Sequence, residues 1–364
     1  MRDRRSLSED FQFLFNPAEP MTAKKEKKNK KDKAKTLSKR ASGKGTAQRE
    51  KGSKARAQDT ERLATSKWTQ LVIRQAIQVA KKTEANAILC YMDSTKDLDP
   101  FSKIQSDARL ILLTKRKECL DKAEDLSIHA VMLPDVKLTR VGYLKIGFLA
   151  AISKGLVRNG DVIVCVGGVP EQGYMDTIML VEAGQESELF GGGEIITFPP
   201  GLEPEVFETV LDLVLELANE GREGKPVGSI FVLGDHERVL ELSYQLVFNP
   251  FQGHPEDALR VYNSDVKETL KEFSSIDGAF VIREDGVVLA AGRYLNVGYQ
   301  GEPLPQGLGA RHAAAAAITQ ASESVALVIS ESTGKVTIFR GGRILSEIEK
   351  AASHAPGRRA LTLE

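Results

Sequence analysis

The sequence has no apolar run that approaches the roughly 20 residues a membrane-spanning helix needs. It has only three cysteines, Cys90, Cys119 and Cys165, scattered along 364 residues. An odd number without a repeated spacing gives neither a disulfide framework nor a zinc site. We therefore expect a cytoplasmic protein without a membrane span. A chain of this length is long enough for two folded domains.

The chain also lacks a net charge at pH 7, because 50 Lys and Arg residues balance 50 Asp and Glu residues. The balance conceals a basic tail: residues 1–60 carry 18 Lys and Arg against 8 Asp and Glu. Residues 21–56 contain almost nothing apolar, so they cannot bury enough surface to fold and we expect disorder. The tail is either a tether for nucleic acid or another anionic surface, or a solubilising segment. Met21 stands directly before the basic run, which makes it a candidate for the true start of the chain.

Residues 61–192 alternate between apolar runs and amphipathic segments. Helical spacing of apolar residues predicts helices over 68–82 and 143–154. Short apolar, β-prone runs predict strands at residues 87–91, 109–114, 130–134, 161–168 and 178–183. Such alternation is typical of an α/β domain with a mainly parallel sheet. The glycine-rich loop at 167–173 either turns the chain, which we favour, or binds a phosphorylated effector.

Residues 193–350 form a second predicted domain, and residues 351–364 a C-terminal tail. A hairpin is indicated where apolar runs at 280–282 and 287–291 flank Asp285-Gly286, since glycine accepts the positive φ of a tight turn. The Ala-rich segment 311–319 is expected to be helical because alanine has the highest helix propensity. The other predicted elements are helices over 203–220 and 264–273 and strands over 227–233, 325–329 and 336–339.

Three joints between these elements carry polar residues suited to phosphate chemistry. Asp277-Gly278 comes directly before a strand, where a carboxylate beside a glycine suits a hard cation or a sugar hydroxyl. Arg311-His312 opens the Ala-rich helix, whose first N–H groups lack partners inside the helix and favour anions. Glu331 follows a strand and offers a second carboxylate. Together these are the parts that phosphoryl or nucleotidyl transfer requires.

Each of these joints, taken alone, has a plainer interpretation. Asp277-Gly278 is by frequency more often an ordinary turn. Arg311 alone is a solvated helix start, His312 a buried structural histidine and Glu331 a loop acid. Their combination and order within one compact module favour the functional interpretation.

The segments IDGAFVI, AAGRYL, LGARH and ISESTG follow one another along the second domain. In their order and spacing they resemble the diadenylate cyclase (DAC) family, which condenses two ATP into cyclic di-AMP. The resemblance implies an α/β domain with a mixed sheet. The family's Asp-Gly-Ala motif is complete at residues 277–279. This chain has Ala313 in place of the last Arg of the family's Arg-His-Arg motif, and Ser332 in place of the last Glu of its Ser-Glu-Glu motif. These departures affect phosphate and metal contacts more than the fold.

The resemblance implies a role for each residue that matches the family. Asp277 and Glu331 are expected to bind Mn²⁺ or Mg²⁺, and Asp277 also to help deprotonate the 3′-hydroxyl of ATP. Arg311 and His312 are expected to hold the triphosphate, and Tyr294 to stack on adenine. The implied ATP-binding residues are Gly278, Ala279, Tyr294, Leu295, Gly309, Ala310, Arg311, His312 and Ser330. Since one subunit supplies half of the reaction, the resemblance also implies a homodimer of facing DAC domains, alone or within a higher oligomer.

The phrase NGDVIVCVGG and the order of elements around it resemble the C-terminal domain of pyruvate kinase. This implies a regulatory α/β module at residues 61–192, and a DAC domain joined to such a module resembles the archaeal-type soluble diadenylate cyclases. Two alternatives remain open. Ala313 and Ser332 indicate a nucleotide-binding sensor that has lost catalysis, and the basic tail indicates a nucleic-acid-associated protein.

Overall fold

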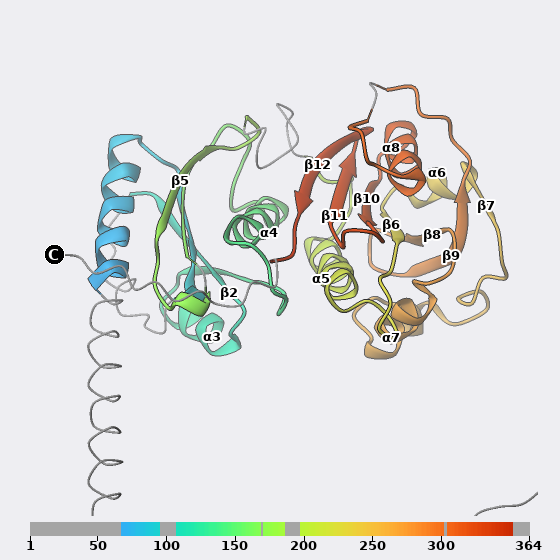
Figure 1. Cartoon of the computed structure of the whole chain (residues 1–364), viewed down its shortest axis with the longest axis horizontal. Coiled ribbons are helices and arrows are strands. Elements are labelled where there is room, and N and C mark those ends of the chain that lie inside the picture. The colour runs from blue at the N-terminus through green and yellow to red at the C-terminus, as the bar shows by residue number, and fades with distance from the viewer. Residues whose placement is uncertain (1–66, 95–106, 169, 186–196, 302–303, 352–364) are drawn as a thin grey trace, which may run out of the picture. The chain divides into compact units, whose positions relative to one another are not determined.

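The computed structural model describes residues 67–94, 107–168, 170–185, 197–301 and 304–351. These residues form two separate sheets with helices packed on them (Figure 1). The predicted basic tail and all but the first residue of the predicted C-terminal tail lie outside the described residues. No helix in the described part of the chain is both long and apolar enough to cross a membrane.

The first sheet has five strands in the order β3-β2-β1-β4-β5. Its strands are β1 (Ala87–Tyr91), β2 (Arg109–Thr114), β3 (His129–Met132), β4 (Val162–Gly167) and β5 (Thr177–Glu182). Four of them pair in parallel, which confirms the prediction of a mainly parallel sheet, whereas β5 pairs antiparallel with β4. The short connection between β4 and β5 explains the exception, because a parallel pair needs a crossover of a dozen or more residues.

The glycine-rich loop after β4 contains the short helix η2 (Pro170–Gln172). A Cβ atom on Gly168 would lie 2.2 Å from the carbonyl oxygen of Tyr174. No side chain fits such a gap, so the glycine is needed for the chain to fold back on itself. The geometry therefore favours the interpretation of this loop as a turn.

Helices cover both faces of the first sheet (Figure 1). One face, with Leu89 and Leu113, packs on α4 (Arg140–Ser153). The other face, with Ile88 and Cys90, packs on a helix over residues 67–82 and on the buried side of α3 (Lys117–Asp125). Because successive residues of a strand point to opposite faces, an all-apolar strand such as β1 is what a sheet covered on both sides requires.

Two helices of this domain differ from the sequence prediction. α4 begins three residues before the predicted start, because the Thr139 hydroxyl accepts the backbone N–H of Gly142 at 3.0 Å and caps the helix there. α3 (Lys117–Asp125) was not predicted. It buries only Cys119 and Ala123, so its charged sequence shows too narrow an apolar stripe to identify a helix.

The second sheet has seven strands in the order β12-β11-β10-β6-β8-β9-β7. The strands are β6 (Ser229–Leu233), β7 (Ser243–Gln245), β8 (Ala279–Ile282), β9 (Val288–Leu295), β10 (Val325–Ile329), β11 (Val336–Arg340) and β12 (Arg343–Ile348). β6 and β8 pair in parallel and the other neighbours pair antiparallel, so the sheet is mixed, as expected. The edge strands β7 and β12 were not predicted.

Helices also cover both faces of the second sheet. α8 (Ala310–Ala321) packs its alanines on the face carrying Ile230 and Val328. α5 (Pro204–Glu220) packs on the opposite face, which carries Phe231 and Ile329. α7 (Ser264–Phe273) lies against α5, and α6 (His236–Glu241) connects β6 to β7. The small side chains of α8 bring its backbone close to the sheet, which places its first turn at the ends of the central strands.

The two Asp-Gly pairs of this domain have the different positions that the sequence indicated. Asp285-Gly286 forms the β8–β9 hairpin turn, with Gly286 at φ 87° and its N–H donated to the carbonyl of Arg283. Asp277-Gly278 lies directly before β8. The hairpin carboxylate is held by Arg283, which lowers the pKa of Asp285 to about 2, so its role is structural.

Candidate active site

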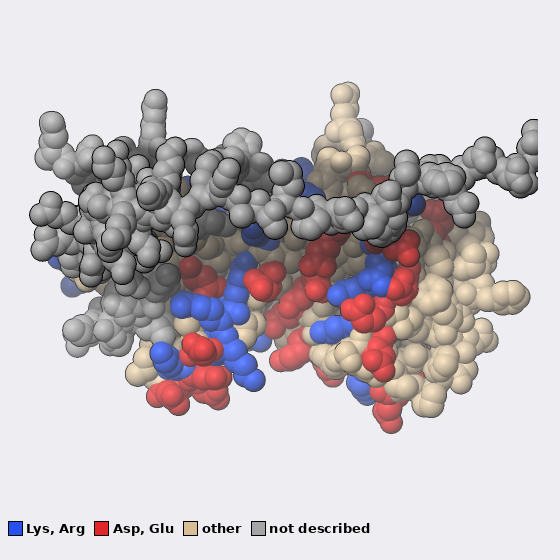
Figure 2. Space-filling model, turned by 60° about the horizontal axis from the view of Figure 1, so that its bottom comes forward, with Lys and Arg blue, Asp and Glu red and all other residues tan. Residues whose placement is uncertain are grey.

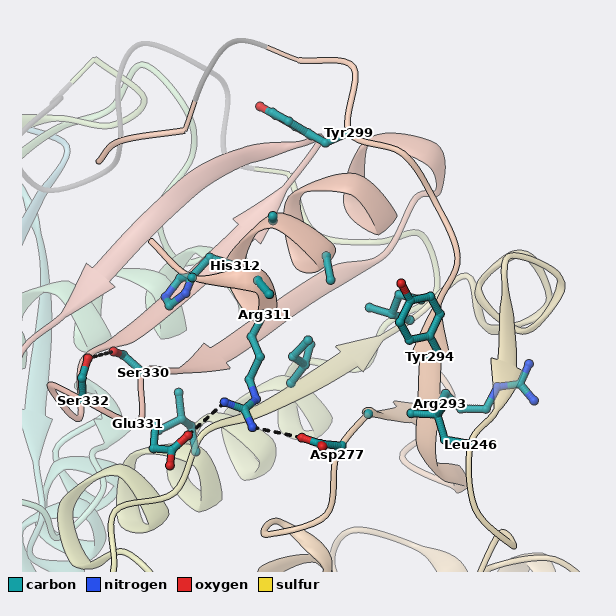
Figure 3. Close-up of a pocket in the computed structure, with 18 of the residues that line it drawn as sticks. Leu246, Asp277, Arg293, Tyr294, Tyr299, Arg311, His312, Ser330, Glu331 and Ser332 are labelled. Carbon is teal, nitrogen blue, oxygen red and sulfur yellow. Dashed lines mark hydrogen bonds and ion pairs between the residues drawn. The ribbon is translucent and has the colours of Figure 1, made fainter. Parts of the chain in front are cut away.

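An open pocket of about 1260 Å³ lies on the α8 side of the second sheet (Figure 3). The start of β8, the end of β9, the first turn of α8 and the turn after β10 line it. These four segments are far apart in the sequence. Three of them contribute the joints that the sequence analysis identified, and the end of β9 contributes Tyr294 and Leu295. The volume is large enough for a nucleotide.

Arg311 connects the two carboxylates of the pocket (Figure 3). Its Nη2 atom lies 3.3 Å from Oδ1 of Asp277, and its Nη1 atom lies 3.1 Å from Oε2 of Glu331. The Asp277 side chain is 89% exposed and that of Glu331 is 61% exposed. Ion pairs this exposed contribute only about 0–1 kcal/mol, so a metal ion or a phosphate group can replace them at little cost.

The donor set of the pocket suits a hard divalent cation. Asp277 and Glu331 provide two carboxylates, each of which pairs with the Arg311 guanidinium. Among the described residues, no group of three or more His, Cys, Asp or Glu side chains could hold a metal ion by itself. One or two carboxylates nevertheless suffice for Mg²⁺ when the phosphates of a substrate complete its coordination.

The first turn of α8 faces the pocket with its backbone. Gly309, the N-cap residue, has extended dihedral angles, and it lines the pocket together with Ala310 and Arg311. The free N–H groups and the dipole of a helix start favour anions. A phosphate at this position would therefore meet both the helix start and the Arg311 guanidinium.

His312 has a different environment from Arg311. Its side chain is buried and lies against Phe339, with ring centroids 6.1 Å apart. Burial lowers the pKa of His312, and Lys335 lowers it further, whereas the Glu347 carboxylate opposes the shift. The imidazole is therefore neutral at pH 7 and can bind a phosphate by donating an N–H but not as a second cation.

The wall toward β7 and β9 carries the aromatic residues. Tyr294, at the end of β9, is half exposed, and its ring lies 5.0 Å from that of Tyr244 on β7. Leu295 is buried behind it and also lines the pocket. A half-exposed ring in the wall of a pocket suits stacking on a planar base. Ala279, in contrast, is fully buried in β8 and does not line the pocket.

The turn after β10 holds Glu331 between two serines. Ser330 and Ser332 approach each other with 3.3 Å between their hydroxyl oxygens, and the backbone N–H of Ser330 is donated to the carbonyl of Lys335. Ser332 and Ala313 both line the pocket. The two positions at which the sequence departs from the DAC motifs therefore both face the space in which a nucleotide would bind.

Arg293 also lines the pocket but is engaged elsewhere. Its guanidinium donates to the carbonyls of Leu240 at 2.7 Å and Ser243 at 2.6 Å, and to the Ser243 hydroxyl. Its side chain points away from Arg311 (Figure 3). Arg293 thus fixes β7 against β9, and Arg311 is the cationic side chain that reaches the carboxylates.

Two glycines make this arrangement sterically feasible, Gly278, which the sequence analysis identified, and Gly228, which it missed. A Cβ atom on Gly228 would lie 2.6 Å from Nη1 of Arg311 and 2.9 Å from Cβ of Glu331. A Cβ atom on Gly278, which has φ 106°, would lie 2.6 Å from the backbone of Gly292. The signal was present for Gly228, because glycine within a strand pattern indicates close approach of another group.

The fold and the pocket define a nucleotide-binding domain, and comparisons with known proteins agree. Residues 216–344 match the family described as DisA bacterial checkpoint controller nucleotide-binding. Residues 69–190 match a family described as probable sensor domain DacZ_P.

Two curated relatives carry the same description, diadenylate cyclase. The one from Methanocaldococcus jannaschii is 32% identical over 278 residues, which cover 75% of this chain and 86% of the relative. The one from Haloferax volcanii is 36% identical over 215 residues, which cover 57% of this chain and 76% of the relative. The chain belongs to the diadenylate cyclase family. Among solved structures, DacA from Staphylococcus aureus aligns with 40% of this chain and 87% of its own at 21% identity and a TM-score of 0.28, too low to support a conclusion about fold.

Proposed function

We propose that this chain condenses two ATP molecules into cyclic di-AMP with release of two pyrophosphates. The observation that carries the proposal is the convergence of Asp277, Glu331 and Arg311 at the first turn of α8, in a member of the diadenylate cyclase family. A carboxylate pair, a cationic fork and a helix start are the parts that transfer of a nucleotidyl group requires. Both curated relatives are described by the same activity.

Asp277 and Glu331 are the residues that would hold Mn²⁺ or Mg²⁺. A bound ion of this kind compensates the charge that develops on phosphate oxygens during transfer. Both side chains are exposed enough to exchange Arg311 for the ion without a change of fold. Carboxylate ligands suit both ions.

Different residues of the pocket would bind different parts of the nucleotide. Arg311, the α8 start and the neutral His312 would bind the triphosphate, and Tyr294 would stack on adenine with Leu295 behind it. Asp277 would accept the proton of the ribose 3′-hydroxyl. The 3′-oxygen then forms a bond to the α-phosphorus of the second ATP, and the bond from that phosphorus to the β-phosphate bridge breaks.

The reaction needs this step twice, because the 3′-hydroxyl of each ATP attacks the α-phosphate of the other. One pocket holds one set of Asp277, Arg311 and Glu331, whereas cyclic di-AMP contains two equivalent phosphodiester bonds. Two copies of the domain would therefore face each other about a twofold axis, each supplying one nucleotide.

Product analysis tests the proposal. Purified chain incubated with ATP and Mn²⁺ is expected to form cyclic di-AMP and two pyrophosphates per product. Asp277→Asn should abolish the product and keep the melting temperature. Asp257→Asn, which removes an exposed carboxylate outside the pocket, is the matched control and should be fully active. Full activity of Asp277→Asn would remove Asp277 from the site.

A nucleotide-binding sensor without catalysis is the second candidate. Ala313 and Ser332 favour it, because both line the pocket where the family motifs have an Arg and a Glu. A sensor would bind ATP with Mn²⁺ and release no pyrophosphate, so the same assay separates the two candidates.

The other modules keep their predicted roles as proposals. Residues 69–190 are proposed to act as a sensor for an effector of unknown chemistry, and the likeness of this module to the C-terminal domain of pyruvate kinase remains a prediction. The basic segment 21–56 remains a proposed site for nucleic acid. Deleting residues 1–60 and comparing DNA and RNA retention across a salt series tests that role, since unchanged retention would exclude it.

A further inference from the structure

The surface beside β7 exposes large apolar side chains in an uncharged stretch of chain. Residues 242–253 contain no Asp, Glu, Lys or Arg. Phe248 is 101% exposed, so its whole ring projects into solvent, and its neighbours Leu246 and Val247 are 45% and 44% exposed. Tyr244 and Tyr294 extend the same surface onto the sheet. We call these five residues the β7 patch.

Figure 2 shows that charged side chains are unevenly distributed over the visible face. Lys, Arg, Asp and Glu gather over the other parts of the molecule, whereas the end at which Figure 1 places β7 and β9 shows almost no charge. The one basic residue of this part of β9, Arg293, points its guanidinium at backbone carbonyls. A cluster of exposed apolar residues on an edge strand usually marks an interaction site.

The β7 patch is continuous with the nucleotide pocket. Leu246 and Tyr294 belong to both. The backbone N–H of Leu246 is donated to the carbonyl of Gly292 at 2.9 Å, and Gly292 is the residue against which Gly278 packs. Val247 and Phe248 directly follow Leu246, which is part of the pocket wall. A partner bound to the patch would therefore also lie at the mouth of the pocket.

We propose that the β7 patch is the contact between two copies of this chain, with Phe248 as its central anchor. The inference rests on the proposed function, because joining two nucleotides twice requires two pockets with facing mouths. A surface near a twofold axis meets its own equivalent, so like charges there would repel, and an uncharged apolar surface avoids this. Among the exposed large apolar side chains of the described residues, the β7 patch is the group that borders the pocket.

Sedimentation velocity on the full chain, over a range of concentrations, tests the contact. The unmodified chain should associate as a dimer or a multiple of dimers, and Phe248→Ser should raise the dissociation constant of the dimer at least tenfold. Phe248→Leu, which keeps an apolar side chain, should restore association. Leu180→Ser is the matched control, because Leu180 is 46% exposed on β5 of the first sheet and should not alter association.

Activity and nucleotide binding complete the test. In Phe248→Ser, product formation per chain should fall at low protein concentration and recover as concentration rises, while affinity for a non-hydrolysable ATP analogue changes less than twofold. An unchanged dissociation constant in Phe248→Ser, or a monomeric unmodified chain at all concentrations, would overturn the inference. Association that depends on Phe248 without any cyclic di-AMP would support the contact and overturn the proposed cyclase activity.

Discussion

At the scale of single residues, the site depends on glycines as much as on polar side chains. Gly228 leaves the space in which the Arg311 guanidinium and Glu331 meet, and the Gly278–Gly292 contact lets the chain carry Asp277 to the start of β8. None of these glycines can touch a substrate through a side chain. They determine where the reacting groups lie, which a search for polar residues overlooks.

Replacing Gly228 with alanine should move Arg311 without disturbing the core. The nearest atom to the new Cβ would be Nη1 of Arg311, the far end of a flexible side chain. We expect kcat/KM for ATP to fall about tenfold to a hundredfold, since displacement of a positioning group by about 1 Å has effects of that size. The melting temperature should change little. Gly298→Ala, at a position with open space around it, is the control. Equal activities of the two variants would show that the Arg311 position does not matter.

Restoring an arginine at Ala313 tests the departure from the family motif. Ala313 is exposed and lines the pocket, so a longer side chain has room to reach the phosphates. Ala313→Arg should lower the KM for ATP several-fold through an added charge-assisted contact. Weaker binding in this variant would mean that another group already occupies the space.

At the scale of elements, periodicity and turn chemistry predicted most of the core. β1, β2 and α7 have the expected bounds, and the Asp285-Gly286 turn joins β8 to β9 as its sequence indicated. Elements with little buried surface were missed, because they leave no apolar pattern. β7 is three residues long, and β12, which follows β11 after Gly341-Gly342, fully buries only Ser346 and Ile348.

The candidate site was predictable for a related reason. Asp277, Arg311 and Glu331 stand at the ends of strongly patterned strands and a helix, which made them visible as polar joints, and the resemblance to the DAC family predicted that they act on one nucleotide. The contribution of Arg293 was not predictable, because its partners are backbone carbonyls of β7 and the residues just before it, a strand that the sequence did not reveal. The neutrality of His312 depends on burial, which a motif does not show.

Helix α5 carries a buried acid whose effect on stability can be tested independently of activity. Asp212 is half-buried, and its burial raises its pKa to about 7, with Glu208 and Glu216 of the same helix raising it further and Lys267 of α7 opposing. Because the folded state binds a proton that the unfolded state releases between about pH 4 and pH 7, Asp212 destabilises the fold progressively as pH rises through that window.

Asp212→Asn should therefore stabilise the protein at pH 8 by about 1 kcal/mol or more, since one pKa unit corresponds to about 1.4 kcal/mol. The difference in the free energy of unfolding between the variant and the unmodified chain should vanish below about pH 4. Chemical denaturation across a pH series measures it. Glu220→Gln, at the exposed end of the same helix, serves as a carboxylate control, and a constant difference at all pH values would contradict the buried acid.

At the scale of the whole molecule, the account requires two copies for one product. If Asp277 of each copy activates the 3′-hydroxyl of its own nucleotide, then a mixed dimer with one Asp277→Asn subunit can form only the first phosphodiester bond. Such a dimer, purified with two different tags, should release one pyrophosphate and accumulate a linear dinucleotide that retains a triphosphate. Mass spectrometry of the products distinguishes this from cyclic di-AMP at half the normal rate, which would show that one Asp277 serves both bonds.

The central claim is that the carboxylates and Arg311 act on one and the same nucleotide. A double-mutant cycle on the affinity for a non-hydrolysable ATP analogue with Mn²⁺ tests it most directly, with Glu331→Gln, Arg311→Ala and the combined variant. The account predicts a coupling free energy of about 1 kcal/mol or more, because groups that share a ligand and touch each other do not contribute independently. Strictly additive losses would show that Glu331 and Arg311 bind separately, and would contradict the account.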